Sequence, residues 1–277
     1  MEPLTIHFLG TGGGRHTMCT QRRKTAGIRL EHGDTQIHID PGPGALVHSI
    51  YAGLSPMKLD GIIVTHCHPD HYTDAEVLVE AMTGGTTRKR GTLAAAKSVL
   101  QGGNDLDPSI SRYHQRLAGK VEILVPGSRF SIGKLGFYAL SAIHGDDDAI
   151  ILIFEVPGVG SLAYTSDTEA YPGLGEVLRG CRMLILGTMW PRGNPLIGHM
   201  CTDDALRVIE EAKPKCAVTT HYGIKILNSD PVKDAAWLQE KSGVPVISAS
   251  DGMTITVDKD IVVKGPRKND EPRRIEA

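Results

Sequence analysis

The sequence has few cysteines and no sign that they are paired. Its five cysteines are odd in number and form no CxxC motif; they are Cys19, Cys67, Cys181, Cys201 and Cys216. This pattern argues against a disulfide framework and against a zinc site built from thiolates. Free thiols in a reducing compartment are the simpler interpretation.

Long apolar runs and an excess of charge are also missing. No stretch approaches the ~20 consecutive apolar residues that a membrane-spanning helix needs, and residues 1–6 do not resemble an export signal. The 30 Lys and Arg nearly balance the 32 Asp and Glu, which leaves a formal net charge of -2. Any binding of a polyanion must therefore come from a local basic patch. We expect a cytoplasmic protein without a membrane partner.

The composition that remains is that of a globular protein with many turns. Hydrophobic residues make up 40% of the 277 residues, with 32 Gly and 16 Pro, which fits one large folded domain. Strand-like runs occur at 4–9, 27–30, 36–39, 61–65, 120–125, 135–143, 150–156, 161–165, 183–186, 216–219 and 254–257. Helical patterns occur at 74–82, 93–100, 173–178, 202–212 and 230–241. Paired strands come first and strands alternating with helices follow, which predicts two mixed sheets packed together with helices outside.

Two segments differ from this pattern. Residues 84–120 contain two Gly-Gly pairs and a basic run at 88–90, which predicts a loop-rich insertion carrying one helix. From residue 259 the sequence is dominated by Lys, Arg, Asp, Glu and Pro. We therefore predict one domain over 1–258, followed by a charged, mobile tail at 259–277. The basic runs at 22–24 and 88–90 add loop charge, although a solvated surface explains each of them equally well.

A dense group of potential metal ligands follows the predicted strand at 61–65. Three imidazoles and one carboxylate fall within six residues: His66, His68, Asp70 and His71. Side chains two positions apart can converge in an extended or turning segment but not on a helix. His66 and His68 can thus bind one ion, while Asp70 and His71 turn toward a neighbouring ion. Histidines packed this closely would repel one another on protonation and would contribute little to a core, so a metal site is the favoured interpretation.

Further potential ligands follow three later strands. His144 comes directly after the strand at 135–143, Asp167 lies just beyond 161–165, and His221 lies just beyond 216–219. A lone histidine after a strand is usually a surface residue, but three ligand types in succession after an incomplete cluster indicate a completed site. Nitrogen and oxygen ligands without thiolate favour zinc, and they also suit manganese or iron.

In this order the ligands resemble the pattern of the metallo-β-lactamase fold superfamily, and the resemblance covers residues 4–257. It implies an α/β fold, a four-layer αββα sandwich of two mixed β-sheets flanked by helices, with two divalent metal ions at the edge between the sheets. Carried over by resemblance, one ion is held by His66, His68 and His144, the other by Asp70, His71 and His221, and Asp167 bridges them. The resemblance also implies that Asp40 orients the ligand loop, although a turn cap would explain Asp40 as well.

The N-terminal segment resembles one branch of that superfamily, the ribonuclease Z-like enzymes and the related cyclic-phosphate phosphodiesterases. Residues 10–15 read GTGGGR. Backbone N–H groups at Gly12 and Gly13 can approach a phosphate, and Arg15 can add positive charge. A plain tight turn accounts for the glycines equally well.

A histidine outside the ligand set lies 22 residues before the last ligand. In the resembling branch a histidine at the position of His199 protonates the leaving group, and Asp70 also belongs to the catalytic set. An imidazole suits this role of general acid. A surface histidine preceding a helix is the alternative. Cys201 and Asp203 replace the acidic residue often found beside that histidine, so its orienting partner stays open.

The resemblance implies a dinuclear metal-dependent hydrolase. We expect a hydroxide that bridges the metals to attack a phosphodiester, in RNA or in a small or cyclic molecule, with His199 as general acid. A thioester, a carboxylic ester or a lactone is the alternative substrate of the same metals, and a non-catalytic metal-binding scaffold is a third interpretation. The acidic run at 146–148, directly after His144, opposes polyanion binding if it faces the metals, which keeps a small phosphodiester as credible as RNA. Relatives in this branch suggest a homodimer.

Overall fold

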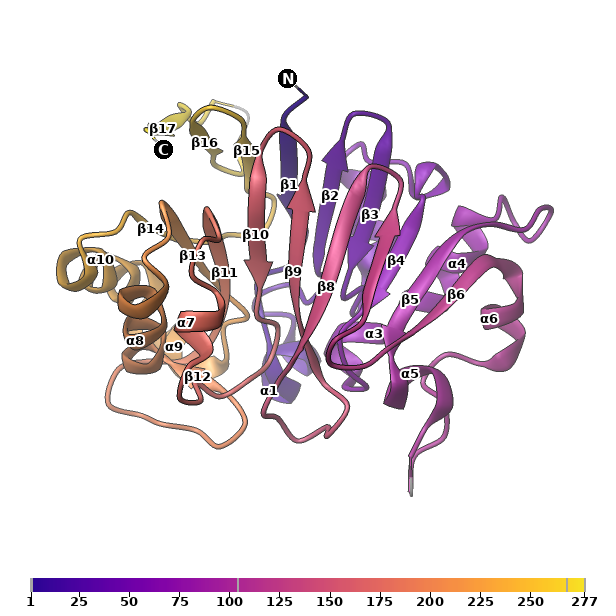
Figure 1. Ribbon diagram of the computed structural model, residues 1–277, viewed down its shortest axis with the longest axis horizontal. Coiled ribbons are helices and arrows are strands. Elements are labelled where there is room, and N and C mark those ends of the chain that lie inside the picture. The colour runs from indigo at the N-terminus through magenta and orange to yellow at the C-terminus, as the bar shows by residue number, and fades with distance from the viewer. Residues whose placement is uncertain (1, 104, 268, 277) are drawn as a thin grey trace.

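Two β-sheets lie face to face in the computed structural model, which describes residues 2–103, 105–267 and 269–276 (Figure 1). The strands of the first sheet are β1 (Leu4–Phe8), β2 (Ile28–His32), β3 (Thr35–Ile39), β4 (Gly61–Val64), β5 (Arg90–Ala96), β6 (Ala118–Leu124), β15 (Thr254–Val257), β16 (Ile261–Lys264) and β17 (Arg273–Ile275). Their order across the sheet is β17-β16-β15-β1-β2-β3-β4-β5-β6. The strands from β3 to β6 are parallel to one another, whereas the other pairs are antiparallel.

The second sheet is also mixed. Its strands are β7 (Arg129–Ile132), β8 (Leu135–Ser141), β9 (Ile150–Val156), β10 (Gly160–Tyr164), β11 (Met183–Trp190), β13 (Cys216–Thr220) and β14 (Val246–Ser248), with β12 (Met200–Cys201) beside β11. Their order is β14-β13-β11-β10-β9-β8-β7. The strands from β10 to β14 on this path are parallel, and those from β7 to β10 are antiparallel.

Helices cover the outer faces of both sheets. On the side of the first sheet lie α2 (Ala45–Tyr51), the 3-10 helix η1 (Pro56–Lys58), α4 (Ala75–Met82), α5 (Lys97–Gln101) and α6 (Arg112–Leu117), whereas α1 (Gly14–Thr20) and α3 (Pro69–Tyr72) lie at one end of the sandwich. On the side of the second sheet lie α7 (Leu174–Val177), α8 (Thr202–Ala212), α9 (Ile224–Ser229) and α10 (Pro231–Ser242). The four layers match the predicted αββα sandwich.

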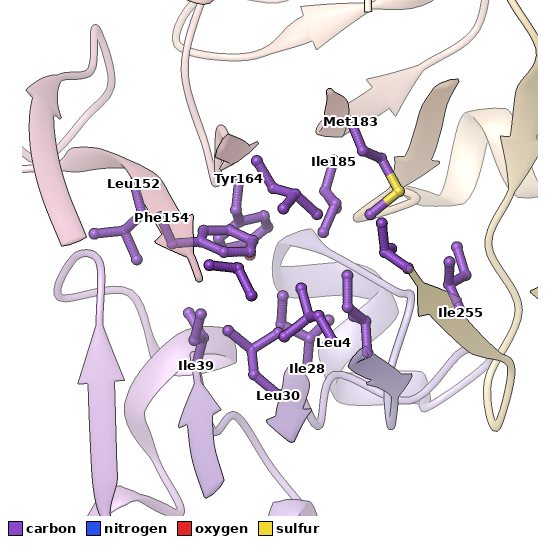
Figure 2. Close-up of a cluster of buried hydrophobic side chains, with 14 of the residues drawn as sticks. Leu4, Ile28, Leu30, Ile39, Leu152, Phe154, Tyr164, Met183, Ile185 and Ile255 are labelled. Atoms are coloured by element: carbon purple, nitrogen blue, oxygen red, sulfur yellow. The ribbon is translucent and has the colours of Figure 1, made fainter. Parts of the chain in front are cut away.

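The main core fills the space between the two sheets. Figure 2 shows side chains of the first sheet pointing toward those of the second; the labelled residues are Leu4, Ile28, Leu30, Ile39, Ile255, Leu152, Phe154, Tyr164, Met183 and Ile185. Alternating burial along β1 and β8 follows from the two-residue period of a strand with one face on this core. Each fully buried aliphatic or Phe side chain contributes roughly 1.5–3 kcal/mol to the free energy of unfolding. Two further clusters lie beneath the helices on either side.

The helix predicted at 93–100 is wrong over its first half, whereas residues 97–100 belong to α5 as predicted. Leu93 to Ala96 belong to β5, which is hydrogen-bonded in parallel between β4 and β6 and is buried on both faces. Alanine favours helices in isolation, but burial between two neighbouring strands overrides that preference. Residues 84–120 are therefore not a loop-rich insertion, because they supply one complete strand of the sheet and part of another.

The segment after residue 258 also differs from the predicted mobile tail. It forms β16 and β17, which extend the first sheet by antiparallel pairing. Ile261, Val263 and Ile275 are buried in the main core, so three apolar residues anchor this otherwise charged stretch. Residues 268 and 277 of this segment lie outside the described residues.

Candidate metal centre

The potential ligands lie on loops that leave the carboxyl ends of strands in both sheets. The loop after β4 supplies four of them, and β8, β10 and β13 are each followed by one more. All of these loops meet at the end of the sandwich where α1, α3 and β12 lie (Figure 1). Pro69 occupies the first turn of α3, a position where its missing N–H costs nothing, and the short helix carries Asp70 and His71 inward.

One group of side chains surrounds His68 Nδ1. The Nε2 atoms of His66 and His144 lie 3.1 and 2.9 Å from it. Asp167 Oδ2 lies 3.8 Å from each of those two Nε2 atoms. Three imidazole nitrogens and one carboxylate oxygen thus converge on a common point.

A second group lies beside the first. His71 Nε2 is 3.0 Å from His221 Nε2, and Asp70 Oδ2 is 3.6 and 3.3 Å from these two nitrogens. Asp167 contacts this group as well, with Oδ1 3.1 Å from His221 Nε2 and Oδ2 3.7 Å from His71 Nε2. The carboxylate of Asp167 therefore reaches both groups.

Hydrogen bonds on the far side of two rings turn their lone pairs toward the centre. His71 Nδ1 donates to Asp40 Oδ2 at 3.0 Å, and His144 Nδ1 donates to the carbonyl of Gly198 at 2.7 Å. In the neutral rings each Nε2 is then left as an acceptor that can bind a cation. Asp167 Oδ1 is buried and makes no hydrogen bond to the described residues. The donor set therefore fits divalent cations bound by nitrogen and oxygen.

The electrostatics of the site favour positive charge. Burial alone would lower the pKa of His71, but the carboxylates of Asp70, Asp167 and Asp40 raise it well above its usual value. Burial alone would raise the pKa of Asp167, but His221 and His71 hold it well below its usual range. The carboxylates are thus charged, and they create a pocket that attracts cations.

Asp40 lies behind the centre and organises it. Its Oδ1 accepts the backbone N–H of Thr65 at 2.8 Å, and its Oδ2 accepts the hydroxyls of Thr65 and Tyr164 at 2.8 and 3.0 Å. With the bond from His71, these contacts connect the start of the ligand loop to β10 of the opposite sheet. The carboxylate is only 2% exposed. Asp40 thus contacts His71 and the start of the ligand loop, the loop that the sequence predicts it to orient.

Asp146 supports the ligand loop. The sequence left open whether the acidic run at 146–148 faces the metals, and in the structure Asp146 is buried. Its Oδ2 accepts the backbone N–H of Cys67 at 2.9 Å and the hydroxyl of Ser98 at 2.6 Å. Burial raises its pKa, yet these hydrogen bonds outweigh burial and lower it. Asp146 thus fixes the backbone between His66 and His68, and no local motif identifies this role.

The glycine-rich segment after β1 packs directly against the ligands. A Cβ on Gly13 would lie 2.2 Å from the ring of His221, so only glycine fits there. The N–H of Gly14 donates to Asp70 Oδ2 at 2.7 Å, and Gly12 forms a β-bridge with Tyr222. These contacts explain the glycines by the positioning of ligands, without a phosphate. Arg15 is exposed on α1.

His199 lies beside the two groups. Its Nδ1 is 3.5 Å from Asp167 Oδ2, and its ring centroid is 4.7 Å from that of His144. Its side chain is 16% exposed, and it lines an open cavity of about 290 Å³ that Ile197 and Arg207 also border. Burial lowers its pKa to about 4, and the nearby Asp167 opposes this shift.

The orienting partner of His199 is not an acidic residue of the following helix. Asp203 accepts the N–H of Gly193 at 2.6 Å, and Asp204 accepts the N–H of Cys201 at 3.0 Å. The backbone just before His199 is held by Glu169, whose Oε1 accepts the N–H of Gly198 at 2.6 Å. Glu169 thereby supports the carbonyl that orients His144.

Comparisons with known proteins agree with this geometry. A family model described as the beta-lactamase superfamily domain matches residues 35–222. The chain belongs to the beta-lactamase superfamily. The uncharacterized protein MJ1374 of Methanocaldococcus jannaschii is 36% identical over 253 residues, which cover 90% of this chain and 94% of that protein. The ribonuclease Z of Thermococcus kodakarensis is 40% identical over only 79 residues, 28% of this chain and 24% of that enzyme.

A superfamily member of known structure shares the same fold. The metallo-β-lactamase fold protein YhfI from Bacillus subtilis has a TM-score of 0.74 at 18% identity, over 92% of this chain and 100% of that one. At this identity the likeness establishes the fold alone. Among the described residues, no helix has the length and apolar character needed to cross a membrane.

Proposed function

We propose that this beta-lactamase superfamily protein hydrolyses phosphodiester bonds at a dinuclear zinc centre. The observation that carries the proposal is the position of His199, an additional imidazole that borders both ligand groups and is open to a cavity. A carboxylic ester, thioester or lactone needs less help in expelling its leaving group than an alkyl phosphodiester does. A general acid beside the metals therefore suits the phosphodiester best.

The residues of the centre have distinct roles in this reaction. When bound, two divalent ions acidify water and withdraw negative charge from a phosphoryl oxygen. His66, His68 and His144 hold one ion, Asp70, His71 and His221 hold the other, and Asp167 joins the two sites. Asp40 and the carbonyl of Gly198 fix the rings of His71 and His144 in the tautomer that presents Nε2.

His199 then donates a proton to the departing oxygen. The negative charge of a bound phosphodiester next to its ring stabilises the imidazolium and opposes the effect of burial. The partial likeness to ribonuclease Z supports this reaction class, and RNA and small phosphodiesters are both candidate substrates. Because the likeness covers a quarter of that enzyme, it does not choose between them.

The role of His199 is tested by varying the leaving group. Bis(p-nitrophenyl) phosphate releases a phenolate that needs little protonation, whereas a dinucleotide releases an alkoxide. His199→Ala should lower kcat for the dinucleotide by roughly 10²–10⁴-fold and should affect bis(p-nitrophenyl) phosphate far less. His16→Ala, on the exposed face of α1, is the matched control. Elemental analysis of the same preparations identifies the metal.

Two results would contradict the proposal. Turnover of a thioester or lactone by a protein that leaves both phosphodiesters intact would assign the other ester classes to the site. Equal losses on both phosphodiesters would remove His199 from leaving-group protonation.

A further inference from the structure

A second surface outside the metal centre has the character of an anion-binding groove. It measures about 690 Å³ and lies between α5, α6 and the edge strand β6. Its charged lining residues are Lys89, Arg112 and Arg116, and within the described part of the chain no carboxylate lines it. A chain with a net charge of -2 thus carries a locally basic surface at this groove.

The three cations are free to bind a ligand. All are exposed, and none forms an ion pair with a carboxylate of the described residues, 2–103, 105–267 and 269–276. Arg112 and Arg116 are four residues apart on α6, where like charges repel and weaken the helix unless an anion lies between them. Arg90 of the same basic run is different, because it bonds to Asp60 and to two backbone carbonyls.

Apolar side chains lie beside these cations. Val121 and Ile123, two positions apart on β6, are 38% and 44% exposed, and both line the groove. A surface that combines cations with exposed apolar groups suits a polynucleotide strand, whose phosphates bind the cations while its sugars and bases contact the apolar groups.

One short helix connects the groove to the metal centre. Ser98 near the start of α5 bonds to Asp146, which in turn holds Cys67 between two metal ligands. Gln101, at the end of the same helix, lines the groove. One end of α5 thus supports the ligand loop through buried residues, and the other end borders the groove.

We propose that this groove binds the backbone of a single-stranded RNA whose scissile phosphodiester lies at the metal centre. The proposal rests on the proposed function and selects its substrate class, because an isolated phosphodiester bound at the metals would not extend into the groove. The contacts are to phosphates, so they hold the strand without reading its sequence.

The first test is binding of RNA to the zinc-loaded protein. The probe is a fluorescent RNA of about 20 nucleotides, longer than the usual site of a single-strand binding module. The logarithm of its affinity should fall linearly with the logarithm of the salt concentration. The double variant Arg112→Ala/Arg116→Ala should reduce that slope by about 1.4, which corresponds to two lost phosphate contacts. The control Arg179→Ala/Lys233→Ala removes two exposed cations from the opposite layer and should leave the slope unchanged.

The second test separates the groove from the metal centre. The groove variant should raise KM for the RNA roughly tenfold, without a change in kcat or in turnover of bis(p-nitrophenyl) phosphate. If the wild-type protein hydrolyses neither bis(p-nitrophenyl) phosphate nor RNA, the proposed function fails. If it hydrolyses them, but the groove variant binds and cleaves RNA like the wild type, only the groove proposal is overturned. Tight binding of polyglutamate without binding of RNA would also overturn it, since the groove would then dock an acidic protein segment.

Discussion

Three residues at the metal centre have a positive φ, a backbone conformation that residues other than glycine rarely adopt. Asp40, Ser166 and His221 have φ values of 53°, 50° and 58°, and the hydroxyl of Ser166 donates to Asp40 Oδ2 at 3.2 Å. Each such residue costs of order 1–3 kcal/mol, and it persists only where its surroundings impose it. Asp40 and His221 are held by the hydrogen bonds and close contacts described above. The ligand types and their spacing are visible in the sequence, but this backbone strain is not, because it arises from packing between distant loops.

The close contact between Gly13 and the ring of His221 can be tested by adding one methyl group. In Gly13→Ala the new Cβ would overlap the ring of His221, and the φ of -148° at this position allows alanine without strain. The ring must therefore move, and zinc affinity should fall about 10- to 100-fold, the usual effect of disturbing a group that orients a ligand. Competition with a chromophoric chelator measures the change.

Gly103→Ala is the matched control, since its Cβ would meet open space. If Gly13→Ala retains the zinc affinity of this control, the tight contact with His221 has no functional weight.

At the scale of elements, sequence patterns show where a strand lies better than they show which strands it packs beside. The predictions at 150–156 and 254–257 coincide with β9 and β15, because apolar runs bounded by turns are clear strand signals. The helix predicted at 93–100 was wrong over residues 93–96, since a run of alanines does not reveal that its neighbours are strands. β16 and β17 were missed for a related reason. They pair with the sheet through their backbones, and only a few apolar residues among many charged ones are buried in the core.

Asp146 connects α5 to the ligand loop, so its substitution should affect stability and zinc binding more than substitution of the neighbouring Asp147. Asp146→Ala removes the acceptor of Cys67 N–H and of the Ser98 hydroxyl, which is buried. The free energy of unfolding should fall by about 2–3 kcal/mol, as for hydrogen bonds to a charged group, and zinc should bind more weakly. Urea denaturation and chelator competition measure the two effects.

Asp147 is the neighbouring control, because its side chain is exposed. Asp147→Ala should change the free energy of unfolding by no more than about 0.5 kcal/mol. Equal effects of the two substitutions would mean that negative charge near the metals, and not support of the loop, is what the acidic run provides.

For the whole molecule, the metal centre depends on the packing of both sheets. Four ligands come from the first sheet and three from the second, so they meet only when the sandwich is assembled. The sequence predicted this assembly through strand-end ligands and their order. It could not predict Asp146 and Glu169, whose partners lie 79 and 29 residues away in the chain.

A buried histidine of the first sheet makes the free energy of unfolding depend on pH. His38 on β3 is fully buried and lies 2.8 Å from the carbonyl of Ala26 through its Nε2. Burial lowers its pKa from 6.5 to about 4. Between these values the unfolded chain binds a proton that the folded chain does not, so the free energy of unfolding falls as the pH falls from 6.5 toward 4. The loss due to this group approaches about 3 kcal/mol at the lower limit.

The variant His38→Gln separates this contribution from that of the metal ligands, which also lose stability in acid. Urea denaturation of zinc-loaded wild type and variant is compared between pH 4 and pH 7.5, and the metal contributions cancel in the difference. The variant can still donate to the carbonyl of Ala26 but does not titrate, so its stability should fall less steeply below pH 6.5. His16→Gln, at an exposed position, should follow the wild-type profile. Parallel profiles for wild type and His38→Gln would show that the buried imidazole is not the acid-sensitive group of the fold.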